Sequence, residues 1–198
     1  MQEGNNQMLN TAQIYEYPFH NPQKNCLGGN IRKNPEALFA RQFARSYSDR
    51  FSQIHSGTCK DKTLFIREVP VSGNGIADLL VFSWSKIFTA QESTPPDLER
   101  LNPTIRAFEF KLSDWRKGMM QAHRYKYFSH ASILVLPKNK IKSVKPELNL
   151  FRKLRVGLWG FLPETGSITC FYTPRPKQQQ IEKHAQKAIR LATQMVFS

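Results

Sequence analysis

Cysteine is scarce in this chain, which has only Cys26, Cys59 and Cys170, all far apart. An odd number of separated cysteines offers neither a disulfide framework nor a CxxC zinc motif. Long hydrophobic runs are missing too, because no stretch approaches the roughly 20 apolar residues of a membrane-spanning helix. The polar N-terminal segment MQEGNNQMLN is unlike a secretory signal. We therefore expect a cytoplasmic protein with no membrane partner.

Motifs of several enzyme classes are absent as well. The sequence has no GxGxxG dinucleotide motif, no Walker lysine motif and no GxSxG nucleophile motif. Its five histidines show none of the spacings of zinc proteases or histidine-metal nucleases. Nucleotide-driven motors, dinucleotide oxidoreductases, α/β-hydrolases and zinc proteases therefore find no support in the sequence.

Acidic residues are few relative to basic ones, with 15 Asp and Glu against 29 Lys and Arg, a formal net charge of +14. A solvated surface is the ordinary interpretation of any single basic run, but the total, with aromatics interleaved, favours a polyanion whose binding weakens with salt. We expect DNA, rather than RNA, as the partner. The residues predicted to contact its backbone are Arg41, Arg45, Arg116, Lys117, Arg124, Lys138 and Lys140.

The chain is long enough for one domain with a sizeable core, since 40% of its 198 residues are hydrophobic. We expect an irregular N-terminal arm over residues 1–30 and a single domain over residues 31–198. The prolines between residues 85 and 104 predict an inserted loop there. We interpret the basic run 138–145 as a connector that follows a buried strand.

Hydrophobic periodicity and turn residues predict the elements of the domain. In chain order we expect a helix from Pro35 to about Ser52, a hairpin of strands Thr63–Val71 and Ile76–Ser83, a strand Ile105–Leu112, a helix from Asp114 to about Ser129, a buried strand Ala131–Pro137, short strands ending near Phe161 and Tyr172, and a helix after Pro176. The predicted fold class is therefore α/β: a small mixed sheet flanked by helices, in the order α-β-β-β-α-β with further strands and a helix at the C-terminal end.

Two strands of this domain carry charges among apolar residues. Alternation along the strand after the insertion places Glu109 and Lys111 on one face, and we expect the opposite face, with Phe108 and Phe110, to be the core. Asp78 lies in the apolar run IADLLVF. If the two strands pair, Asp78 and Glu109 can converge on Mg²⁺, and Lys111 can orient an attacking water or help to deprotonate it. An alternative is an ion pair that only stabilises the sheet.

These residues, followed by the helix motif Gln121-Ala-His-Arg-Tyr125, resemble the PD-(D/E)xK nuclease superfamily, in the branch with a QAxxY motif. Ala77 stands where the nominal motif has proline. The resemblance implies a restriction-endonuclease-like core and a metal site at Asp78 and Glu109, with Mg²⁺ as cofactor and Mn²⁺ as a substitute. It adds Gln121 to Asp78, Glu109 and Lys111 as catalytic residues.

Three further residues are candidates to support the site. Glu36 falls in the first turn of the first helix, where a carboxylate is also favoured by the helix dipole alone. Glu68 lies on the first strand of the hairpin and offers another carboxylate. Tyr125 shares a helix face with Gln121, although a packing role is the common one for a tyrosine.

The resulting hypothesis is a metal-dependent endonuclease that hydrolyses DNA phosphodiester bonds, in a larger DNA-processing, mobile-element or defence system. Since no helix-turn-helix or zinc finger is recognisable, a protein partner or a homodimer would supply specificity. One alternative is a catalytically weak nucleic-acid-binding or assembly subunit with the same fold. Another is a structural RNA-binding protein, for which neither metal nor Lys111 would matter.

Overall fold

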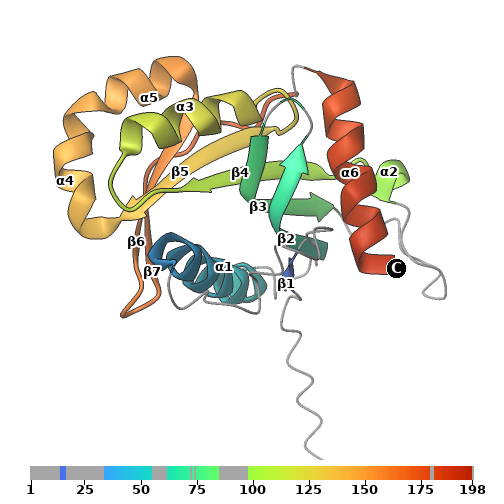
Figure 1. The fold of residues 1–198 in the computed structure, drawn as a ribbon, viewed down its shortest axis with the longest axis horizontal. Helices are drawn as coiled ribbons and strands as arrows, with labels where there is room; N and C mark the ends of the chain where they lie inside the picture. Colours follow the sequence, from blue (N-terminus) through green and yellow to red (C-terminus); the bar gives the residue numbers. More distant parts are fainter. Residues whose placement is uncertain are drawn as a thin grey trace, which may run out of the picture.

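A single seven-stranded sheet organises the protein, and its strand order follows the chain from β1 to β7 (Figure 1). The computed structural model describes residues 14–16, 34–54, 62–71, 73, 75–84, 98–178 and 181–197. The strands are β1 (Ile14–Glu16), β2 (Lys62–Val71), β3 (Gly75–Trp84), β4 (Thr104–Phe110), β5 (Ala131–Pro137), β6 (Val156–Leu162) and β7 (Ser167–Tyr172). Three neighbouring pairs are parallel and three antiparallel, so the sheet is mixed, as predicted.

Helices flank both faces of this sheet. They are α1 (Pro35–Ile54), α2 (Leu98–Leu101), α3 (Trp115–Tyr125), α4 (Ile141–Val144), α5 (Leu148–Leu154) and α6 (Glu182–Phe197), with the 3-10 turns η4 (Lys138–Lys140) and η5 (Lys145–Glu147) beside α4. Figure 1 shows α1 on one side of the sheet and α3 and α5 on the other. The predicted α/β class is confirmed.

Helix α1 covers its face with aromatic side chains. Asn34 caps the helix, because its Oδ1 accepts hydrogen bonds from the backbone N–H groups of Glu36 and Ala37. About two turns further in, the Phe43 ring lies 5.1 Å from that of Phe110 and 5.5 Å from that of Phe108. Full burial of each such ring contributes about 1.5–3 kcal/mol, so this cluster anchors α1 to the sheet.

The opposite face is also packed, which corrects the expectation that β4 has a single core face. Ile105 and Ala107 are fully buried in a cluster with Tyr125, Phe128 and the alanines of α6. The physical reason is that β4 pairs in parallel with β5, and strands in the parallel part of a sheet are covered by helices on both sides. Glu109 and Lys111 therefore continue a buried face.

Three segments that the sequence left irregular have regular structure. The basic connector 138–145 folds into η4 and α4, because Ile141 and Val144 bury their side chains there. In the expected insertion 85–104, residues 98–101 form α2 and β4 begins at Thr104, while 85–97 lie outside the described residues. The short strand β1, within the predicted irregular arm, pairs with β2.

The helices also bear on the question of a membrane. Among the residues that the structure describes, none of the helices is both long enough and apolar enough to cross a bilayer.

Candidate active site

The two predicted metal-binding carboxylates lie on neighbouring strands at the same level. The antiparallel ladder between β3 and β4 ends at the pair Leu79 and Phe108. The next position along this register sets Asp78 opposite Glu109. There the backbone N–H of Phe110 donates a 2.8 Å hydrogen bond to Oδ2 of Asp78. The Asp78 side chain thus binds a backbone donor where the ladder stops, and this bond holds the carboxylate against β4.

Glu109 is buried, with 1% of its surface exposed, and both of its carboxylate oxygens have partners. Lys111 Nζ lies 2.7 Å from Oε1 in an ion pair. The hydroxyl of Tyr125 donates to Oε2, and Tyr125 Oη also lies 2.7 Å from the carbonyl oxygen of Ile76. Tyr125 is therefore both a packed aromatic and a polar contact, and it joins Glu109 on β4 to the beginning of β3.

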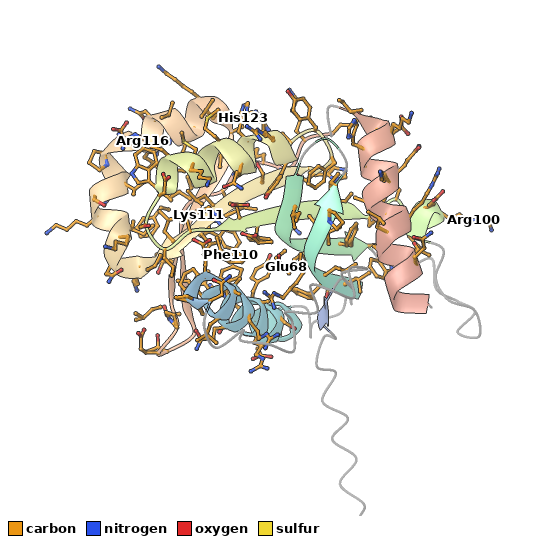
Figure 2. The ribbon with its side chains drawn as sticks, in the orientation of Figure 1. Glu68, Arg100, Phe110, Lys111, Arg116 and His123 are labelled. Carbon is orange, nitrogen blue, oxygen red and sulfur yellow. The ribbon has the colours of Figure 1, made fainter. Side chains whose placement is uncertain are left out.

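Glu36 reaches the same place from α1. Its Oε2 lies 3.4 Å from Lys111 Nζ, and its Oε1 accepts a 3.1 Å hydrogen bond from the backbone N–H of Leu112. Lys111 Nζ also donates to the carbonyl oxygen of Phe110 at 2.9 Å. Figure 2 labels Lys111 and Phe110 over the part of the sheet between α1 and α3. The structure therefore places Glu36 at the candidate site, beside the lysine.

Glu68 lies in a strained position on β2. The register pairs Arg67 with Leu79 and Val69 with Ala77, so Glu68 falls opposite Asp78. Its φ of 55° is in the left-handed region, which costs a residue with a side chain about 1–2 kcal/mol. Its Oε1 lies 3.4 Å from Nη2 of Arg67. Acidic residues consequently occupy one level on three adjacent strands, and one of them, Glu68, has a strained backbone conformation.

Gln121 is placed on the same helix as Tyr125, one turn earlier, but it forms no hydrogen bond with Asp78, Glu109 or Lys111. Its side-chain oxygen is buried without a hydrogen-bond partner among the described residues. The structure thus links Glu36, Lys111, Glu109 and Tyr125 through direct contacts and sets Asp78 opposite Glu109. It leaves Gln121 outside these contacts with an unused acceptor.

Gly118 is a site residue that sequence reasoning missed. A Cβ atom there would lie 2.6 Å from Cγ of Lys111 and 2.7 Å from Cδ1 of Leu134. Only glycine lets α3 pack this closely on the stem of Lys111. The available signal was a glycine inside a predicted helix, where it costs about 1 kcal/mol and therefore calls for a packing reason.

Burial and mutual repulsion shift the proton affinities of these groups. Burial, followed by the charge of Glu109, raises the pKa of Asp78 to about 8, although the Phe110 N–H and Lys111 oppose the shift. Burial also raises the pKa of Glu109, against the hydrogen bonds from Lys111 and Tyr125. Burial alone would lower the pKa of Lys111, but Glu109, Asp78 and Glu36 raise it overall. Without another cation, the site holds more carboxylate than its one lysine can neutralise.

This imbalance fits a hard divalent cation. Asp78 forms no ion pair within the described residues, and its Oδ1 accepts no hydrogen bond from them. No three His, Cys, Asp or Glu side chains in the described part of the chain are arranged as a ready metal site. Mg²⁺ does not require three, because one or two carboxylates, several waters and the substrate's phosphate oxygens are its usual ligands. Asp78 and Glu109 are the residues that would hold it.

Four of the seven predicted backbone-binding residues lie near this site, and three lie apart from it. Lys138 and Lys140 follow β5, whose end lies beside the end of β4, at the same edge as Lys111. Arg116 and Lys117 begin α3 at that edge, whereas Arg124 lies in the last turn of the helix. Arg41 and Arg45 belong to α1, on the other face. The two pairs Lys138/Lys140 and Arg116/Lys117 therefore flank the candidate site. The remaining three arginines stand apart from it.

Comparisons with models of protein families, with curated proteins and with solved structures found no match to this chain.

Proposed function

We propose that this protein is a metal-dependent nuclease that hydrolyses phosphodiester bonds of DNA. One observation carries the proposal: Asp78 and Glu109 stand opposite each other on neighbouring buried strands, and Lys111 is held beside them. Burying three charged groups in an apolar sheet costs free energy. This cost favours a functional role for them over a purely structural one. The order of the elements and the helix carrying Gln121 and Tyr125 further support the resemblance to PD-(D/E)xK nucleases and their restriction-endonuclease-like core.

The chain's own residues would divide the reaction as follows. Asp78 and Glu109 would hold Mg²⁺, which when bound would supply positive charge to stabilise the phosphate during the reaction. Lys111, held 2.7 Å from Glu109, orients the attacking water and stabilises the charge that develops on the phosphate. Water forms the new bond to phosphorus in line as the bond to the 3′ oxygen breaks. The proton of the attacking water passes to solvent, and the leaving 3′ oxygen takes a proton from solvent. Glu36 and Tyr125 fix the positions of Lys111 and Glu109.

A cleavage assay at low salt tests this proposal. Plasmid and end-labelled oligonucleotides are incubated with Mg²⁺, Mn²⁺ or EDTA, and the wild type is compared with Lys111→Ala and Asp78→Ala. We expect cleavage by the wild type only with metal, and a loss of about a hundredfold or more in each variant, as when one group that stabilises a transition state is removed. Binding of the same oligonucleotides in EDTA should persist in both variants.

The matched control is Lys187→Ala, which removes an exposed lysine of α6. It should cut like the wild type. If the wild type and both site variants bind nucleic acid equally and none cuts, the nuclease proposal fails. A binding or assembly subunit with this fold then takes its place.

A further inference from the structure

Four cations from three parts of the chain meet away from the candidate active site. Lys126 follows α3, Arg155 precedes β6, and Arg175 and Lys177 follow β7. We call these four residues the basic cluster. Lys126 Nζ donates to the carbonyl oxygen of Leu154 at 2.8 Å, which ties the end of α3 to the end of α5. The fold thus assembles positive charge that is dispersed along the sequence.

The segment that carries Arg175 and Lys177 is held firmly. Arg155 Nη2 donates to the carbonyl oxygen of Arg175 at 3.0 Å, and the backbone N–H of Lys177 donates to the carbonyl oxygen of His130 at 2.9 Å. Pro174, before them, is buried. Both side chains remain exposed on a backbone that is fixed at three points, so an anion that binds there does not have to order the backbone as well.

No acidic side chain neutralises this cluster within the part of the chain that the structure describes. The side-chain hydrogen bonds of Lys126 and Arg155 go to backbone carbonyls, and none of the four cations forms an ion pair with a described carboxylate. Burial, then the charges of Arg155 and Lys177, lowers the pKa of Lys126. Unpaired like charges that lie close together repel one another, and a bound anion would relieve that repulsion.

The cluster and the candidate site lie at opposite ends of β4. The backbone N–H of His130 donates to the carbonyl oxygen of Ile105, so Lys177, which binds His130, lies near the start of the strand. From Ile105 to Glu109 is four residues, or about 13 Å of strand. One turn of a DNA duplex is about 34 Å long, so a single duplex can reach both places.

We propose that Lys126, Arg155, Arg175 and Lys177 form a second binding surface for nucleic-acid phosphates, which holds the backbone at a distance from the reacting phosphate. The inference rests on the proposed function, because the active site would bring the same polyanion alongside. Tyr127, which is exposed next to Lys126, adds an aromatic surface of the kind that interleaves with cations in nucleic-acid interfaces. The surface therefore serves affinity, while chemistry remains at Asp78, Glu109 and Lys111.

Binding in EDTA tests this surface without any cleavage. Affinity for a duplex of about 20 base pairs is measured at several salt concentrations for the wild type, the double variant Arg175→Gln/Lys177→Gln and the control Lys187→Gln. Loss of two phosphate contacts should lower the slope of log affinity against log salt by up to about 1.8, at about 0.9 for each contact. We expect the double variant to bind about tenfold more weakly at low salt and the control to bind like the wild type.

Three results would overturn the inference. The first is a double variant with the affinity and salt slope of the control, and the second is a wild type that binds no duplex. The third is loss of binding to anionic phospholipid vesicles with duplex binding intact, which would assign the cluster to a membrane surface. Circular dichroism of all proteins checks that they are folded. The proposed function fails separately: a wild type that binds through the cluster but never cuts with Mg²⁺ retains this inference and loses the nuclease.

Discussion

The two faces of β4 use alternate residues of one strand for opposite purposes. On the α1 side, Phe108 and Phe110 are fully buried among aromatic rings of α1 and β6. On the α3 side, Ile105 and Ala107 continue the core, but Glu109 and Lys111 then replace apolar residues. Burial of the aromatic rings on the first face stabilises the fold, whereas burial of the charged groups on the second face destabilises it. Stability and chemistry should therefore respond to different mutations.

The largest effect on stability is expected from Phe43→Ala. This ring is fully buried and touches the rings of Phe108, Phe110 and Trp159. Its removal leaves a cavity, and the free energy of unfolding should fall by about 3–5 kcal/mol in a urea titration. Cleavage per folded molecule should stay at the wild-type level.

Leu38→Ala is the matched control on the same helix, because 43% of Leu38 is exposed. It should cost less than about 1 kcal/mol. A loss of activity in folded Phe43→Ala protein would contradict the separation of the two faces.

Asp78→Asn should stabilise the protein at alkaline pH, which is the opposite of the effect of Phe43→Ala. The pKa of Asp78 is about 8 in the folded protein, against an ordinary 3.8. A carboxyl whose folded pKa is raised stabilises the fold while protonated, and this contribution is lost as pH rises from about 4 to about 8. Asn cannot ionise, so the variant should be about 1–3 kcal/mol more stable than the wild type at pH 8 and nearly equal to it at pH 4.

Denaturant titrations at pH 4, 6 and 8 without divalent cations check this difference, with the exposed Asp49→Asn as the control. If the difference in free energy of unfolding does not grow with pH, burial does not disfavour the charged form of Asp78. The same Asp78→Asn protein should cut DNA at least a hundredfold more slowly, so that stability and activity move in opposite directions.

Gly118→Ala tests how closely α3 must approach Lys111. A Cβ at this position would lie 2.6 Å from Lys111 Cγ, so the lysine stem or the helix has to move. We expect cleavage at saturating DNA to fall about tenfold, because small displacements of a positioned group are costly, while DNA affinity in EDTA is unchanged. Met120→Ala, an exposed position on the same helix, should cut like the wild type. Equal cleavage by Gly118→Ala and Met120→Ala would show that Lys111 tolerates the shift.

The sequence predicted the parts of the fold and site that depend on local patterns. The pairing of Asp78 with Glu109 followed from alternation and from two adjacent strands. What it missed depends on contacts between distant segments. The second buried face of β4 requires α6 to return to the sheet, and the role of Gly118 requires the distance between α3 and β4. Likewise, nothing local marks Glu68 for a left-handed φ, and Arg155 meets Lys126 only after folding.

The smallest effect is expected from Tyr125→Phe, which keeps the ring in the core and removes only its hydroxyl. The change deprives Glu109 Oε2 and the Ile76 carbonyl of one polar partner and should cost about 1 kcal/mol of stability. Because Glu109 retains Lys111, catalysis should weaken only severalfold, through a less fixed carboxylate, and the Mg²⁺ concentration needed for half-maximal cleavage should rise. Tyr172→Phe on β7 controls for loss of a tyrosine hydroxyl at a residue that belongs to neither proposed binding surface. If both variants require the same Mg²⁺ concentration, Tyr125 contributes only apolar packing and its hydroxyl does not position Glu109.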